Sequence, residues 1–338
     1  MEILRHIIQK LKNEENNNRK WLRDNFELAS DDKFTAVAIN DKYFKLFPGP
    51  EFSTFIYRGQ VSFHNPCVSN IFRNNRNHSE RFIALLQLCE FSYLLKNHPI
   101  VLDVQKLKID NKVMKLDYEG MAQHYGLLTE LLDFTSDLDI ALFFATNNYD
   151  EYKDVYMPVM DKSRIGVLYK YNYAFDFSSN YINPNHEAIG LQPLPRPGFQ
   201  KTYSYRLKNK NNLNNQKYIE TIMFQHDPVV SIYYSGKYES GKKLFPYDPI
   251  DSKTKLIKNS KIFSIRAFDS VYENNHSLSR SHIINKLQAH GISVEDTLVF
   301  EFTKDELSEI QTHWDAEKIN FLAKIGIRLS YYADINES

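Results

Sequence analysis

Polar residues that could do chemistry are concentrated between Tyr118 and Thr146, in the stretch YEGMAQHYGLLTELLDFTSDLDIALFFAT. It contains a Gln123-His124-Tyr125-Gly126 motif and then an Asp133-Phe134-Thr135-Ser136 motif. Asp, Thr and Ser side chains before a helix, together with its first N–H groups, can hold an anionic ligand. The alternative is that Asp133, Thr135 and Ser136 only cap the helix that follows, which is the more frequent role of these residue types.

A second polar motif, Arg58-Gly59-Gln60, ends the apolar run that begins at Phe55. An arginine fork makes charge-assisted hydrogen bonds to phosphate or ribose oxygens. Glycine lets the backbone turn or lets a ligand approach closely. The alternative is an ordinary surface arginine at the end of a strand.

Hydrophobic periodicity predicts the elements that must position these motifs. Helices are expected over residues 1–25, 78–97, 118–125 and 138–147, the last one buried because it is apolar almost all round. Between the last two helices we expect a turn at Asp133–Ser136. Strands are expected over 33–39, 55–60, 165–171, 219–225 and 229–234, and residues 209–216 form an Asn/Lys-rich loop.

Composition narrows the class of protein. The 338 residues contain 42 Lys+Arg and 42 Asp+Glu, so the formal net charge is zero, which argues against a broad nucleic-acid or membrane-surface binder but leaves room for a local basic groove. Cys67 and Cys89 lack metal-ligand spacing, and we expect two reduced thiols, no metal site and a cytoplasmic protein. No signal peptide and no membrane span are expected. The abundance of Asn, Lys and Ile suggests an AT-rich bacterial or phage genome.

Four ordered motifs resemble the bacterial FRG domain, a family named for its Phe-Arg-Gly motif. They are Tyr57-Arg58-Gly59-Gln60, Ala122-Gln123-His124-Tyr125-Gly126-Leu127, Leu131-Leu132-Asp133-Phe134-Thr135 and Ala141-Leu142-Phe143-Phe144-Ala145, and the likeness continues through Leu191–Pro197 and Gln200. Tyr57 replaces the naming Phe, and Leu128 and Glu130 stand where the family often has Pro and Arg. The resemblance implies an N-terminal helical segment (1–50), an FRG core (51–237) and an α/β extension (238–338) that completes the same domain.

The chain also resembles ADP-ribosyltransferases of the arginine–serine–glutamate group. Arg58-Gly59 is similar to their first motif, and Phe134-Thr135-Ser136 with Ala141, Phe144 and Ala145 is similar to their second. The third motif, a strand with a catalytic glutamate, has no clear match, because Gln200 or Gln288 could occupy that position and Glu187 and Glu220 lack the motif. This resemblance implies an α+β fold with an ADP-ribosyltransferase-like mixed or antiparallel sheet core flanked by helices, and NAD as the cofactor.

The second resemblance also implies roles for the motif residues. The catalytic residues would be His124, Asp133 and Gln200, and the NAD-binding residues would be Arg58, Gly59, Gln60, Gln123, Tyr125, Thr135 and Ser136. Tyr125 or Tyr118 would stack on the nicotinamide ring, Asp133 would act as the acid in place of the glutamate, and His124 would be a base or would only lock its turn.

These roles describe a toxin or phage-defence effector that binds a nucleotide and modifies a macromolecule. Two alternatives stay open. One is a non-catalytic module that senses a nucleotide or nucleic-acid fragment. The other is a metal-dependent nuclease that uses Glu119, His124 and Asp133.

Overall fold

The computed structural model describes residues 3–25, 33–49, 55–172, 185–209, 211–275, 278–296 and 300–327. The α-helices are α1 (Leu4–Asn25), α2 (His78–Leu95), α3 (Pro99–Val104), α4 (Tyr118–His124), α5 (Leu138–Thr146), α7 (Pro195–Phe199), α8 (Pro228–Lys237), α9 (Ile250–Asn259), α10 (Ile265–Asn275), α11 (Arg280–Ala289) and α12 (Lys304–Ala323). Short 3-10 helices are η1 (Asn70–Asn75), η2 (Leu213–Asn215) and η3 (Glu239–Gly241).

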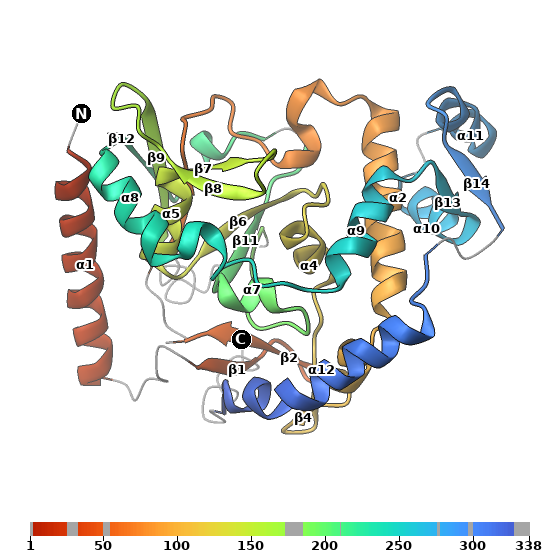
Figure 1. The fold of residues 1–338 in the computed structure, drawn as a ribbon, viewed down its shortest axis with the longest axis horizontal. Helices are drawn as coiled ribbons and strands as arrows, with labels where there is room; N and C mark the ends of the chain where they lie inside the picture. Colours follow the sequence, from red (N-terminus) through yellow and green to blue (C-terminus); the bar gives the residue numbers. More distant parts are fainter. Residues whose placement is uncertain are drawn as a thin grey trace.

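The strands are β1 (Phe34–Ala38), β2 (Tyr43–Pro48), β3 (Phe55–Gln60), β4 (Lys108–Ile109), β5 (Lys112–Met114), β6 (Leu131–Thr135), β7 (Asn147–Asp150), β8 (Val155–Pro158), β9 (Ile165–Asn172), β10 (His186–Ala188), β11 (Thr202–Arg206), β12 (Ile219–Gln225), β13 (Ile262–Ser264), β14 (Ser293–Glu295) and β15 (Ile325–Ile327). Helices and strands together give a mixed α+β fold, as the sequence predicts (Figure 1).

A six-stranded sheet forms the centre of the molecule, in the order β10-β11-β6-β3-β9-β12. Every neighbouring pair in it is antiparallel. The polar motifs therefore lie on adjacent strands, because β3 carries Arg58-Gly59-Gln60 and β6 carries Asp133 and Thr135. The register pairs Tyr57 of β3 with Thr135 of β6.

Helix α5 packs directly on β3 and is buried almost throughout. It begins where the Asp137 side chain accepts hydrogen bonds from the Asp139 and Ile140 N–H groups, which satisfies two otherwise unpaired donors of the first turn. Asp137 is thus the residue whose side chain caps α5. Thr135 supports this cap, since its Oγ1 accepts from the Asp137 N–H at 3.1 Å.

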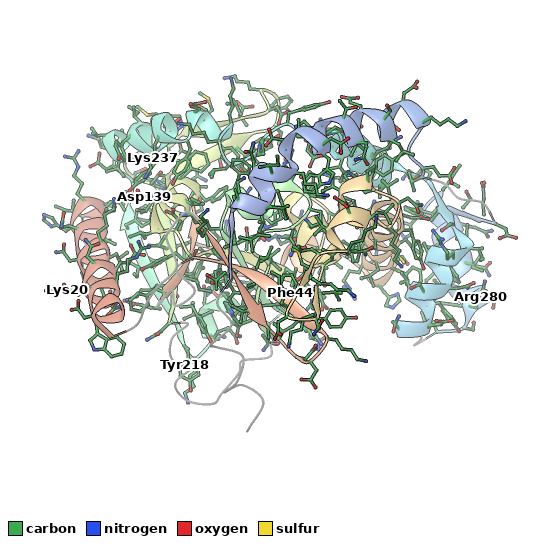
Figure 2. All side chains as sticks on the ribbon, turned by 90° about the horizontal axis from the view of Figure 1, so that it is seen from below. Lys20, Phe44, Asp139, Tyr218, Lys237 and Arg280 are labelled. Atoms are coloured by element: carbon green, nitrogen blue, oxygen red, sulfur yellow. The ribbon has the colours of Figure 1, made fainter. Side chains whose placement is uncertain are left out.

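The amphipathic N-terminal helix is confirmed as α1. Its buried residues Leu4, Ile7 and Leu11 join the core formed by β3, α5, β9 and α8. In Figure 1 the helix stands at one end of the molecule, beside α8. At the opposite end α10 and α11 pack against α2, and Figure 2 shows this separation through Lys20 on α1 and Arg280 on α11.

A second, five-stranded sheet has the order β15-β1-β2-β5-β4. It is mixed, because β1 pairs in parallel with β15 and antiparallel with β2. Helix α12 covers it through Trp314 and Phe321, which pack with Phe34 and Leu46. The segment from 238 onward thus contributes β15 to a sheet that otherwise comes from residues before 115.

Two expected elements are wrong in type. Asp133–Ser136 is not a turn, because Leu131–Thr135 forms the buried strand β6. Val229–Tyr234 is not a strand but part of α8, because the Asp227 side chain caps its N-terminus and Pro228 occupies the first helical turn. A short, nearly continuous apolar run such as Val229–Tyr234 fits a buried strand and a buried helix segment equally well, so periodicity alone could not separate them.

Candidate functional site

A cavity of about 440 Å³ lies beside the junction of β3 and β6 and brings most of the predicted residues together. Its lining includes Arg58, Gly59, Gln60, Gln123, His124, Asp133, Thr135 and Gln200. These residues come from β3, the end of α4, β6 and the residue after α7. The volume is within the range of small-molecule sites, about 300–1,000 Å³.

Arg58 is held at the end of β3 by the neighbouring strand. Its Nη1 donates to the backbone carbonyl oxygen of Asp133 at 2.8 Å. Its Nε is buried and has no hydrogen-bond partner among the described residues. A buried, unpaired N–H is costly, so a ligand oxygen here would satisfy a donor that the protein leaves open.

Gly59 is required by the packing of α5. A Cβ at this position would lie 1.9 Å from the Ala141 carbonyl oxygen and 2.8 Å from the Ala145 Cβ. The glycine of the Arg-Gly motif therefore allows α5 to lie close to β3. Gly59 also lines the cavity.

His124 and Gln200 form a buried pair with a defined direction. Gln200 Nε2 donates to the Leu244 carbonyl oxygen at 3.0 Å. Gln200 Oε1 therefore faces His124 Nδ1 at 3.1 Å and accepts a hydrogen bond from the Nδ1–H group. Burial lowers the pKa of His124, although Asp133 and the bond to Gln200 oppose this, so the ring is neutral at neutral pH. His124 Nε2 then carries a lone pair, and it has no partner among the described residues.

Asp133 is the only carboxylate in the described lining of this cavity. Its Oδ2 accepts from Gln123 Nε2 at 3.2 Å, and its Oδ1 lies 3.8 Å from His124 Nε2. Gln123 is itself fixed, because its Oε1 accepts from Thr129 Oγ1 and Asn70 Nδ2. Two acceptors, Asp133 Oδ1 and His124 Nε2, thus face each other with a gap that a hydroxyl or amide donor of a ligand could bridge.

Two predicted ligand-binding residues lie outside the lining. The Tyr125 hydroxyl donates to Asp248, and the Arg196 guanidinium lies 4.3 Å from the Tyr125 ring centroid. Ser136 is buried, and its N–H donates to the Lys201 carbonyl oxygen. Tyr118 is likewise elsewhere, bonded through its hydroxyl to Gln105.

Several lining residues were not predicted from the sequence. They are chiefly His64, Asn147, Asn148, Tyr149, Tyr156 and Phe245. The β7–β8 hairpin supplies an aromatic wall, in which the Tyr156 ring stacks on Phe245 at 5.3 Å and lies 5.2 Å from Tyr149. The tyrosines that follow Thr146 are the sequence feature that could have indicated this wall. Strands β7 and β8 have only four residues each, which is too short for hydrophobic periodicity to identify them.

The remaining acidic candidates are engaged elsewhere. Glu187 pairs with Lys45, and Glu220 lies 3.5 Å from Lys170. Glu119 pairs with Arg206 at 2.6 Å. Among the described residues no group of three His, Cys, Asp or Glu side chains could hold a metal ion.

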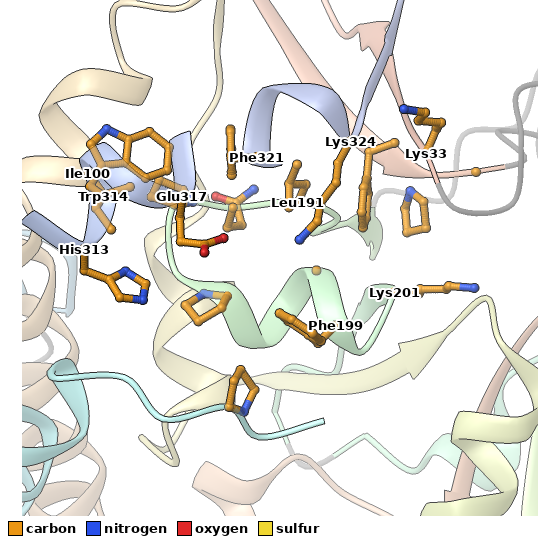
Figure 3. Close-up of a pocket in the computed structure, with 18 of the residues that line it drawn as sticks. Lys33, Ile100, Leu191, Phe199, Lys201, His313, Trp314, Glu317, Phe321 and Lys324 are labelled. Atoms are coloured by element: carbon orange, nitrogen blue, oxygen red, sulfur yellow. The ribbon is translucent and has the colours of Figure 1, made fainter. Parts of the chain in front are cut away.

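A second cavity, of about 460 Å³, lies between α7, α12 and the five-stranded sheet (Figure 3). Leu191, Phe199, Trp314 and Phe321 give it an apolar lining. The Leu191–Pro197 part of the family-like sequence borders this cavity and not the first one.

The family model described as FRG domain matches residues 53–154. The match begins near the expected start of the core at residue 51, contains all four motifs and stops well before residue 237. No curated protein and no solved structure matches the chain significantly, so the comparisons give no support to the resemblance to ADP-ribosyltransferases. No helix in the described part of the chain is long and apolar enough to cross a membrane. With β3, α4, β6 and α5 all inside the matched range, residues 53–154 are an FRG domain, and the protein is one that carries this domain.

Proposed function

We propose that the cavity between β3 and β6 binds NAD or a related nucleotide, and that the protein transfers ADP-ribose as a toxin or phage-defence effector. The observation that carries the proposal is the convergence of Arg58, His124 and Asp133 on one cavity with an aromatic wall. Arg58 offers its open Nε donor to a phosphate or ribose oxygen. An ADP-ribosyltransferase-like core is the fold that this proposal implies for the six-stranded sheet.

The polar groups and the aromatic wall have complementary tasks in this proposal. Tyr149 and Tyr156 take the stacking role proposed above for Tyr125, since flat rings bind flat heterocycles through offset or edge contacts. A ribose hydroxyl would donate into the gap between Asp133 and His124. As nicotinamide leaves, the Asp133 carboxylate would stabilise the positive charge that develops on the ribose ring.

Gln200 would position His124 and would not replace the missing glutamate. Both ends of its amide are already committed, one to Leu244 and one to His124. This commitment is also the observation that favours the alternative, a non-catalytic module that senses a nucleotide. The two functions differ in turnover, because only the enzyme releases nicotinamide.

Isothermal titration of the protein with NAD tests the proposal. We expect a saturable heat for the wild type and at least about tenfold weaker binding for Arg58→Ala, because a charge-assisted hydrogen bond is worth about 1.5–3 kcal/mol. Arg280→Ala is the matched control, since Arg280 lies on α11 and pairs with Asp269. No heat with the wild type, or equal loss in the control, would contradict the NAD site.

A further inference from the structure

Two segments that are far apart in the sequence form one face without acidic residues. Residues 61–79 and 207–219 contain no Asp or Glu, whereas the whole chain has 42 of them in 338 residues. The same segments contain Arg73, Arg76, Lys208 and Lys217. We refer to these two segments together as the acid-free face.

Direct hydrogen bonds join the two segments. The Leu213 N–H donates to the Cys67 carbonyl oxygen at 2.8 Å, and the Cys67 N–H donates to Asn212 Oδ1 at 2.8 Å. Ser69 Oγ donates to the Leu207 carbonyl oxygen at 3.1 Å, which brings the Lys208 region next to η1. Over residues 61–79, 207–209 and 211–219, the acid-free face is therefore one connected part of the structure and not two separate loops.

The cations of this face are not neutralised. Arg73, Arg76, Lys208 and Lys217 form no ion pair with a carboxylate in the described part of the chain, nor do Arg58 and Arg164 beside them. Elsewhere, Arg5, Arg196, Arg206 and Arg280 each pair with an acid, whereas Arg81 bonds to the Arg76 carbonyl oxygen and Arg266 lies over the Tyr93 ring.

The pKa of His64, on the first segment, responds to the positive charge of these side chains. Partial burial lowers its pKa, and the nearby cations Arg73, Arg164 and Arg58 lower it further. Two acids flank the segments in the sequence: Glu80 accepts from the Asn77 N–H at 2.7 Å, and Glu220 lies 3.5 Å from Lys170. Glu130 is paired with Arg206, and Asp133 faces the cavity.

The acid-free face borders the cavity of the proposed function. His64 lines that cavity, and its carbonyl oxygen accepts from Asn214 Nδ2 of the second segment at 2.9 Å. The exposed side chains in the described part of the face are arginine, lysine and asparagine, together with His64, Pro66 and Phe63, and Phe63 is 36% exposed. Unpaired cations that interleave with amides and an exposed ring are the groups that bind a sugar–phosphate backbone and stack on a base.

We propose that the acid-free face binds a single-stranded nucleic acid and presents it to the cavity. This inference rests on the proposed function, because it names the macromolecular partner of the same site. Figure 2 shows Tyr218, the neighbour of Lys217, at an outer edge of the molecule and far from Arg280. The zero net charge of the chain means that attraction to a polyanion would be confined to this face.

Fluorescence anisotropy with short labelled oligothymidylate and oligouridylate tests the inference, and the two probes separate DNA from RNA. We expect salt-dependent binding to the wild type and about tenfold or greater weakening in Arg73→Glu/Lys208→Glu. The slope of log K against log salt concentration should become shallower by about 0.7 for each lost phosphate contact. Lys106→Glu/Lys261→Glu is the control, because it reverses two exposed lysines elsewhere on the surface. Lys208→Gln/Lys217→Gln repeats the test without changing the Arg73 side chain, which bonds to the Val68 carbonyl oxygen. Weaker binding in this variant would therefore not come from a lost hydrogen bond within the fold.

Three outcomes would overturn the inference: no binding of either probe, equal weakening in the control, or equal binding of polyglutamate, which would indicate an acidic protein as the partner. An NAD titration of the same wild-type sample separates the two proposals. Oligonucleotide binding without NAD binding contradicts the cavity ligand alone. NAD binding without oligonucleotide binding contradicts the nucleic-acid partner alone.

Discussion

At the scale of single residues, the cavity is distinguished by polar groups whose orientation is fixed but whose hydrogen bonding is incomplete. His124 is locked through Nδ1 while its Nε2 stays open, and Arg58 is locked through Nη1 while its Nε stays open. Buried polar atoms are normally paired, and Asn147 Oδ1 in the same lining is unpaired too among the described residues, so these atoms are where the proposed ligand would make the missing bonds.

Asp133 gives the sharpest test at this scale. In Asp133→Asn we expect nicotinamide release to fall by about 10²–10³-fold, since one charge-stabilising group is removed, while NAD binding changes little. Release of nicotinamide followed by chromatography, with NAD binding by titration, measures both. Asp161→Asn changes an exposed carboxylate outside the cavity and should leave both unchanged. Unaltered release in Asp133→Asn would remove this residue from the chemistry.

At the scale of elements, the site depends on how closely α5 approaches β3. The helix backbone and the Ala145 methyl group occupy the space that a side chain at residue 59 would need. Because α5 follows directly on β6, its position also sets the path of the strand that carries Asp133. Gly59 of the Arg-Gly pair is thus required by the fold, whereas Arg58 would contact the ligand in the proposed function.

Gly59→Ala should lower the free energy of unfolding by about 1–3 kcal/mol or more, as expected for an overfilled core. Gly236→Ala is the control, because no atom lies within 4 Å of a Cβ at this exposed position in α8. The control should be neutral or stabilised by up to about 1 kcal/mol. Urea denaturation compares the two, and equal stability of both variants would show that α5 can shift away from β3.

The sequence alone predicts the residues that line the cavity better than the secondary structure that positions them. The Arg58, Gln123, His124 and Asp133 motifs were visible because their residue types are unusual inside apolar runs. The secondary structure of residues 131–135 could not be predicted in the same way. Asp, Thr and Ser favour turns locally, whereas pairing with β3 and β11 makes the segment a strand. The β7–β8 wall depends on contacts with Phe245, about ninety residues later, and such contacts leave no local pattern.

At the scale of the whole molecule, α1 joins parts of the fold that are distant in sequence. Its side chains pair with three of them: Arg5 with Asp227 before α8, Lys12 with Asp139 in α5, and Glu14 with Lys170 in β9. Beside these pairs lies Glu15. Burial raises the pKa of Glu15 to about 7, Arg19 opposes the shift, and the acids Asp137 and Asp139 add to it.

Glu15 makes stability depend on pH. The folded protein keeps this proton up to about pH 7, while the unfolded chain releases it near 4.5, so stability is lost as the pH rises across this window. The expected loss from this group is about 3 kcal/mol. Urea denaturation gives the free energy of unfolding of both proteins at each pH. The value for Glu15→Gln minus the value for the wild type should be larger at pH 8 than at pH 5. A constant difference between the two proteins across this range would contradict the assignment.

The pairing of β1 with β15 has a consequence for biosynthesis. Phe34 and Ile325 are register partners, so during translation the first strand leaves the ribosome long before its neighbour exists. Until then one side of β1 offers unpaired N–H and C=O groups, which are a template for neighbouring nascent chains. Expression yield of this protein should therefore respond to chaperones that shield such edges, independently of anything that happens in the cavity.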